Sequence, residues 1–236
     1  MSAAALLARV RDYPYVAAGE RFALGPEPPG DTPAIIAFGA NADPAVLAAK
    51  LGPGASVRGR PARLADHDVA FSAHISPYGA IPAALVPSPG TSVGVHLLRL
   101  APADLERLDA TEPNYVREIL GPGVEVYRSR HGVLLLDGAP VAMAAVPATG
   151  RTLPALTQQA LQERLRDAME PRTDRDAFVL AGARDPEVRA RRTAWLREYG
   201  LCLRRPGPRS PSRGRDDQPG HQAADRAERD DLQGRA

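Results

Sequence analysis

The chain has 236 residues, of which 44% are hydrophobic and 5% aromatic, and its formal net charge is +2. This composition predicts a soluble protein with one sizeable domain and appendages. The near-neutral charge gives no electrostatic reason to expect binding to nucleic acid or to a membrane surface. Lys50 is the only lysine. We interpret the predominance of arginine as coding bias rather than as selection for phosphate binding.

Cysteine content and the N-terminus favour a cytoplasmic protein. Cys202 is the only cysteine, so neither an intramolecular disulfide nor a cysteine-based zinc site can form. Arg9 and Arg11 interrupt the short apolar run near the N-terminus, which makes it a poor signal peptide. No stretch reaches the ~20 apolar residues that a membrane span requires.

The N-terminal part of the chain predicts an extension followed by a strand, a turn and a helix. Residues 1–32 have the character of an added helix and a linker, because helical spacing of apolar residues gives way to proline and glycine. Residues 34–38 form an apolar run typical of a buried strand. Asp43 is a natural N-cap and Pro44 suits the first helical position, so a helix is expected from Ala45 to Leu51.

The central region, residues 33–148, alternates strand patterns with one more short helix. The pattern predicts a turn near residues 65–66 and another at residues 87–90, each between two strands. A helix is expected at residues 103–111. Strands are predicted at residues 56–64, 69–71, 83–86, 92–100, 116–120, 124–127 and 141–146. Several strands with two short helices indicate an α+β domain.

The C-terminal region predicts helices and then a tail. In residues 149–203, a helical stripe is formed by Leu153, Leu156, Ala160, Leu161 and Leu165. A second helix is expected at residues 186–199, with Val188, Ala194 and Trp195 as packing residues. Residues 204–236 have eight arginines, six acids and no aromatic residue, so we expect them to be disordered.

Two segments carry candidate chemistry. Gly39, Ala40 and Asn41 form a turn before a helix N-terminus, where free backbone N–H groups can hold a carboxylate or a phosphate. Glu112 shares a helical face with Leu105 and ends the helix beside a proline. Desolvation there would disfavour the charged carboxylate, which suits a general base. The plainer alternatives are an ordinary turn and a solvated glutamate at a helix end.

Three segments together resemble the gamma-glutamylcyclotransferase-like family. Residues 36–41 are similar to its Tyr-Gly-Ser-Asn signature, and residues 93–100 to its strand of the form Gly-Val-Leu-Tyr-x-Leu. Residues 105–112 are similar to its Leu-x-x-Leu-Asp-x-x-Glu, which ends in the catalytic glutamate. Residues 58–60 and 69–72 fit the strands between them, so the resemblance covers about half of the chain.

The resemblance implies a small mixed β-barrel flanked by short helices, with a polar cavity at one end, to which the C-terminal residue pattern adds a helical extension. It implies an enzyme of the lyase or acyltransferase type that releases 5-oxoproline from a gamma-glutamyl amide or peptide by intramolecular aminolysis. Glu112 would be the general base. Neither a metal nor a cofactor would be needed. The substrate-binding residues implied are Phe38, Gly39, Ala40, Asn41, Tyr78 and Tyr115.

The departures from the family pattern leave other functions open. Phe38 and Ala40 replace a tyrosine and a serine, and Pro113 follows the glutamate where glycine is usual. A reshaped pocket, or an inactive module that binds a small carboxylate, is the main alternative. In a third hypothesis the C-terminal helices are the working part of an interaction protein. The pattern indicates nothing about the oligomeric state.

Weaker candidates lie elsewhere. Residues 66–68 (Asp-His-Asp) suggest a metal site, but a solvated turn is the better interpretation. His74 and Ser76 are candidates for the mouth of the pocket beside Tyr78. His131 and Asp137 are expected to be loop ends.

Overall fold

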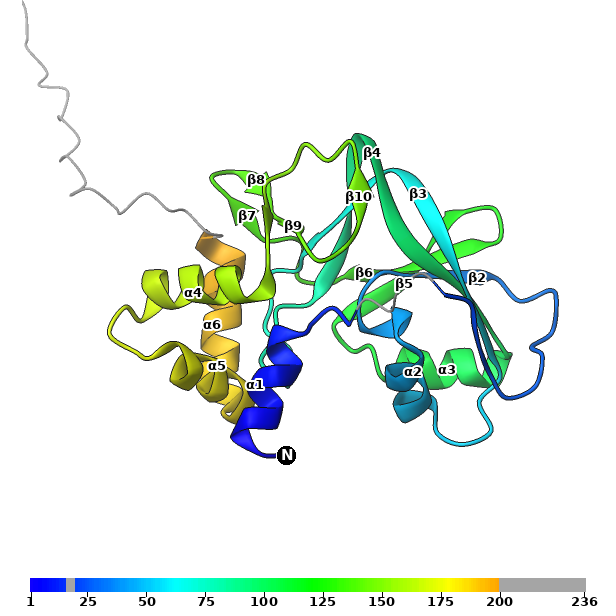
Figure 1. The fold of residues 1–236 in the computed structure, drawn as a ribbon, viewed down its shortest axis with the longest axis horizontal. Coiled ribbons are helices and arrows are strands. Elements are labelled where there is room, and N and C mark those ends of the chain that lie inside the picture. The colour runs from blue at the N-terminus through cyan, green and yellow to red at the C-terminus, as the bar shows by residue number, and fades with distance from the viewer. Residues whose placement is uncertain (16–19, 200–236) are drawn as a thin grey trace, which may run out of the picture. The chain divides into compact units, whose positions relative to one another are not determined.

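Strands and helices are both abundant in the computed structural model, which describes residues 1–15 and 20–199. In that part of the chain six α-helices accompany a mixed sheet, so the α+β class is confirmed (Figure 1). None of the helices in these two ranges has the length and apolar character needed to cross a membrane. Cys202 and residues 204–236 lie outside the described residues.

The main sheet has the strand order β11-β9-β3-β4-β2-β6-β5, with β1 paired to β3 and β10 to β4. Two pairs are parallel, β2 with β6 and β9 with β11, and the other pairs are antiparallel. β7 and β8 form a separate pair. The strands are β1 Phe22–Leu24, β2 Ala34–Ala37, β3 Val57–Phe71, β4 Ala83–Leu100, β5 Tyr115–Gly121, β6 Val124–Ser129, β7 Leu135–Leu136, β8 Ala139–Pro140, β9 Ala142–Met143, β10 Ala148–Thr149 and β11 Ala155–Leu156.

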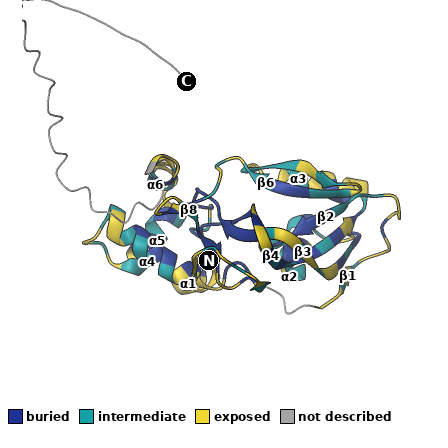
Figure 2. Cartoon of the chain, turned by 90° about the horizontal axis from the view of Figure 1, so that it is seen from above, coloured by how far each residue is buried: buried dark blue, intermediate teal, exposed yellow. Residues whose placement is uncertain are grey.

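The helices form two groups (Figures 1 and 2). α2 and α3 contact each other beside the sheet, whereas α5 contacts α1, α4 and α6. Asp43 caps α2 through two backbone N–H groups, as its position before Pro44 predicts. The helices are α1 Ala3–Arg11, α2 Pro44–Leu51, α3 Pro102–Ala110, α4 Gln158–Met169, α5 Arg175–Arg184 and α6 Pro186–Tyr199, and a short 3₁₀ helix, η1, spans Ala40–Ala42.

The two turns predicted inside the central strands are wrong, because β3 and β4 each run without interruption. The register of the β3–β4 pair shifts between Ala65 and His67 instead of ending there. At this bulge Asp66 adopts a positive φ of 56°, and its carboxylate accepts a hydrogen bond from Gly90 N at 2.9 Å. Residues typical of turns therefore mark a bulge in a long hairpin.

Residues 66–68 are predicted to be a solvated turn, but they lie within β3: Asp66 is exposed at the bulge, whereas Asp68 is not solvated. The Asp68 side chain is fully buried, because it lies on the inner face of β3 beyond the bulge. Its carboxylate accepts two hydrogen bonds from Arg151, at 2.8 and 2.9 Å, and a third from Val69 N. A buried carboxylate needs such a partner.

The C-terminal helices begin later than the leucine stripe predicts. α4 starts at Gln158 behind a Thr157 cap, and Leu156 lies in β11. α5, which Asp174 caps, was not expected. The predicted bounds of α6 are confirmed. Within α6 Ala194 is exposed, and Leu196 takes the buried position.

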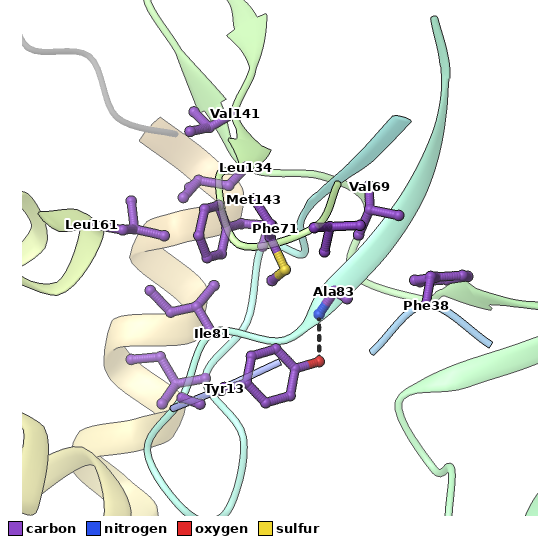
Figure 3. Packing of buried hydrophobic residues seen from close by; sticks show 14 of the residues in the cluster. Tyr13, Phe38, Val69, Phe71, Ile81, Ala83, Leu134, Val141, Met143 and Leu161 are labelled. Atoms are coloured by element: carbon purple, nitrogen blue, oxygen red, sulfur yellow. Dashed lines mark hydrogen bonds between the residues drawn. The ribbon is translucent and has the colours of Figure 1, made fainter. Parts of the chain in front are cut away.

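The hydrophobic core consists of two clusters. The larger one joins the sheet to α1, α4, α5 and α6 and includes Phe71, Ile81 and Leu161 (Figure 3). The smaller one lies between the sheet and the α2–α3 pair. Val10 and Tyr13 belong to the larger cluster, and β1 pairs with β3. The N-terminal extension is therefore packed into the central fold rather than added to it.

Candidate functional site

A cavity of about 230 Å³ lies where four segments meet: the turn after β2, the C-terminal half of α2, the connection between β3 and β4, and the loop after α3. All seven site residues that the sequence predicts line this cavity, namely Phe38, Gly39, Ala40, Asn41, Tyr78, Glu112 and Tyr115. His74 and Ser76, the weaker candidates, also line it.

The turn after β2 takes its shape from a glycine. A Cβ atom on Gly39 would lie 2.8 Å from the Tyr13 hydroxyl and 3.1 Å from the Ala83 Cβ, so only glycine fits. The turn closes through Ala42 N to Gly39 O, at 2.8 Å. Within the described ranges, the backbone N–H groups of Gly39, Ala40 and Asn41 donate to no protein acceptor. They are free to bind an anion at the start of α2.

Glu112 lies just beyond α3 and is held by two donors. Its Oε1 atom accepts hydrogen bonds from Asn41 Nδ2 at 3.0 Å and from Lys50 Nζ at 2.5 Å. Lys50 Nζ also donates to Asn41 Oδ1 at 2.7 Å, which closes a triangle of three side chains. Only 12% of the Glu112 side chain is exposed. Within the described ranges, Oε2 accepts no hydrogen bond, which leaves this oxygen for a ligand.

The sequence pattern predicts the wrong environment for Glu112 and does not identify its ion-pair partner. The helical pattern predicts an unpaired carboxylate on an apolar face, whereas Glu112 forms an ion pair with Lys50 of α2. The two residues are 62 positions apart, so no local pattern connects them. One feature of the sequence could have drawn attention to Lys50: it is the only lysine among the 30 lysine and arginine residues.

Two tyrosines fix the wall of the cavity at Ala83. Ala83 N donates to the Tyr13 hydroxyl at 2.9 Å (Figure 3). The Tyr115 hydroxyl donates to Ala83 O, also at 2.9 Å. Burial raises the pKa of Tyr13 and of Tyr115 well above the usual value, so both hydroxyls stay protonated. Tyr13 comes from the N-terminal segment, and no sequence pattern indicated that this segment contributes to the site.

A second polar group in the cavity is the buried His74. Its Nδ1 atom lies 2.7 Å from Ser72 Oγ, which in turn lies 2.6 Å from Ser129 Oγ. The His131 ring stacks on the His74 ring with 4.4 Å between centroids, and its Nε2 atom lies 2.9 Å from Asn114 Oδ1. His131 lies in the turn after β6, as predicted, and its ring also supports the cavity wall.

Burial of the His74 imidazole, with a smaller effect from His131, lowers its pKa from 6.5 to about 3. The folded protein therefore keeps His74 neutral at neutral pH. The unfolded chain takes up this proton near pH 6.5, whereas the folded chain takes it up only near pH 3. The stability that this group contributes is complete above pH 6.5 and is lost as the pH falls.

We expect His74→Asn to remove this pH dependence. Between pH 7 and pH 5 the wild type should lose about 2 kcal/mol of unfolding free energy through His74. The variant should lose about that much less, because asparagine can still bond Ser72 but does not titrate. Urea unfolding of both proteins at the two pH values measures the difference. Equal losses would show that His74 is not a buried neutral imidazole.

Comparison with known proteins adds no relative: no family model, no curated protein and no solved structure matches the chain.

Proposed function

We propose that this protein is a gamma-glutamylcyclotransferase-like enzyme that releases 5-oxoproline from a gamma-glutamyl amide or peptide. One observation carries the proposal: Asn41 and Glu112, which belong to the two key motifs of the resemblance and are 71 positions apart, form a 3.0 Å hydrogen bond at a shared cavity. A chance resemblance of short motifs gives no reason for the two to meet.

The finer fold belongs to the same proposal. The family order of strand, glycine turn, helix, two strands and helix corresponds to β2, η1, α2, β3, β4 and α3. We therefore assign the sheet to the gamma-glutamylcyclotransferase-like β-barrel type. The parallel pairing of β2 with β6, beside antiparallel β4, puts the Gly39 turn next to β6 and agrees with a mixed barrel.

The reaction uses the substrate's own amine. The free N–H groups of the Gly39 turn bind the alpha-carboxylate of the glutamyl group. Oε2 of Glu112 accepts a proton from the alpha-amine as its nitrogen attacks the gamma-carbonyl carbon, and a five-membered lactam forms. The bond from that carbon to the departing nitrogen then breaks, and Glu112 returns the proton to the departing amine. No water is consumed.

Lys50 acts as a positioning residue in this scheme. Its ammonium holds Oε1 of Glu112 and Oδ1 of Asn41 together, which fixes the carboxylate against the turn. Lys50 thus orients the base without touching the substrate, and an oriented base raises the effective concentration of the reacting groups.

The lining also favours a particular class of leaving amine. Four tyrosines, Tyr13, Tyr78, Tyr115 and Tyr127, line the cavity of a chain that contains only six. Lys50 is the one cation among the described lining residues, and it is already paired. Such a wall accepts an aromatic or apolar amine better than an amino acid with a free carboxylate.

A second function is favoured by the ion pair itself. Lys50 already forms an ion pair with Glu112, the proposed base. In addition, Phe38 and Ala40 lack the hydroxyl groups of the family pattern. The same turn could hold a small carboxylate, without turnover, in a binding module.

Mass-spectrometric detection of 5-oxoproline separates the two functions. The substrates compared are gamma-glutamylanilide, gamma-glutamylalanine and glutathione. The enzyme hypothesis expects release, fastest from the anilide. Release from none of the three, together with calorimetric binding of glutamate or 5-oxoproline, would instead support the binding module.

A further inference from the structure

A second cavity, of about 480 Å³, lies along β1, the start of β3 and the end of β4, and shares no lining residue with the candidate active site. Four arginines line it, Arg21, Arg58, Arg60 and Arg99, with Glu27 as the one acid. We call it the arginine cavity. Because the net charge of +2 equals that of residues 204–236, the remaining 203 residues are formally neutral. Positive charge is therefore concentrated here.

The strand register puts three of the arginines on one face of the sheet. In the β3–β4 pair Arg58 lies directly opposite Arg99, and Arg60 lies directly opposite Leu97. Directly opposed residues of an antiparallel pair share a face, and residues two apart along a strand do so too. Like charges directly opposite each other are unfavourable. An anion bound between them would relieve that repulsion.

Two of the arginines are fixed in place and two are free. Arg58 pairs with Glu27 at 2.5 Å and donates to Pro26 O, and Arg99 donates to Gly30 O at 2.8 Å. In contrast, Arg21 and Arg60 form no hydrogen bond or ion pair with any residue of the described ranges. The site thus combines preorganised cations with two guanidinium groups that have no partner among the described residues.

We propose that the arginine cavity binds a small phosphorylated ligand with at least two negative charges, such as a diphosphate. Guanidinium groups match phosphate oxygens through paired hydrogen bonds. The cavity volume lies within the range of small-molecule sites. A nucleic acid would need an extended basic surface, and residues 1–203, which are formally neutral with the cavity included, do not supply one. Coding bias alone would not gather four arginines at one cavity, so we do not regard it as the full explanation of the arginine content.

Isothermal calorimetry with pyrophosphate tests the proposal on the full chain. We expect binding of pyrophosphate to be tighter than that of succinate, a dianion without phosphate, and to weaken as salt rises. The double variant Arg21→Ala/Arg60→Ala should bind pyrophosphate at least 10-fold more weakly. The matched control is Arg172→Ala/Arg191→Ala, which removes the same charge from two exposed positions and should bind like the wild type.

Three results would overturn the proposal. Equal weakening in both double variants would show that only net charge matters. Unchanged binding in Arg21→Ala/Arg60→Ala would place the anion elsewhere, for example at the Gly39 turn. Tighter binding of a single-stranded oligonucleotide than of pyrophosphate would identify a polyanion surface. Thermal unfolding of each variant establishes that it is folded.

Discussion

Replacing Glu112 by glutamine is expected to lower the rate of 5-oxoproline release by about 10²–10⁴-fold, the usual contribution of a general base. Glutamine keeps the shape of the side chain and one oxygen for Lys50 and Asn41, but it cannot accept the proton of the attacking amine. Substrate affinity should change little, because in the proposed mechanism the glutamyl group is held by the backbone N–H groups of the Gly39 turn. The rate constant and the dissociation constant are measured separately with the best substrate of the panel.

A matched variant distinguishes catalysis from a general effect of charge. Glu118 of β5 pairs with Arg128, and half of its side chain is exposed. Glu118→Gln makes the same chemical change and should leave the rate unaltered. If Glu112→Gln released 5-oxoproline as fast as Glu118→Gln does, Glu112 would not be the base.

The effect of Glu112→Gln on stability should be small. A carboxylate on an apolar helix face would gain stability on neutralisation. Because Glu112 is instead paired with the partly exposed Lys50, the variant loses that pair, and we expect a decrease of no more than about 1 kcal/mol. Thermal unfolding measures the change, and a clear gain in stability would contradict the ion pair.

Replacing Arg151 by alanine is expected to lower the free energy of unfolding by about 3–5 kcal/mol. Asp68 is completely buried, and Arg151 supplies two of its hydrogen bonds. Removal of the guanidinium leaves the carboxylate buried with only a backbone N–H as donor. Urea unfolding at pH 7 measures the loss.

Two further variants make this result specific. Arg128→Ala breaks an ion pair whose acid, Glu118, is half exposed, and should cost less than about 1 kcal/mol. The double variant Asp68→Ala/Arg151→Ala removes both charges and should be less destabilised than the sum of its two single variants. Additive losses would show that Asp68 and Arg151 are not coupled.

Local patterns predicted the elements whose determinants are close in sequence. Asp43 and Pro44 are sufficient to start α2, and the bounds of α6 follow from its own residues. The continuity of β3 could not be predicted, because Asp66 has the preferences of a turn residue and only its bond to Gly90 reveals a bulge. α5 did not stand out because its buried residues, Phe178, Val179 and Gly182, give only a weak apolar stripe.

The site was predicted only where a family pattern exists. Glu112 and the Gly39 turn match motifs, and both line the cavity. Lys50 and Tyr13 match none, because each reaches the site through tertiary contacts to distant segments. A side chain that acts through such contacts leaves no periodic signal in its own segment.

The long β3–β4 hairpin also has a consequence for the order of folding. Its two strands are joined by residues 72–82, and the separation of paired residues rises from 12 positions at Phe71–Ala83 to 43 at Val57–Leu100, so the pairing can start from contacts close in the chain. Local contacts close small loops and favour early formation. The bond between Asn41 and Glu112 spans 71 positions, and that between Tyr13 and Ala83 spans 70. We therefore expect the cavity to be assembled after the hairpin, so that an intact site requires the whole fold.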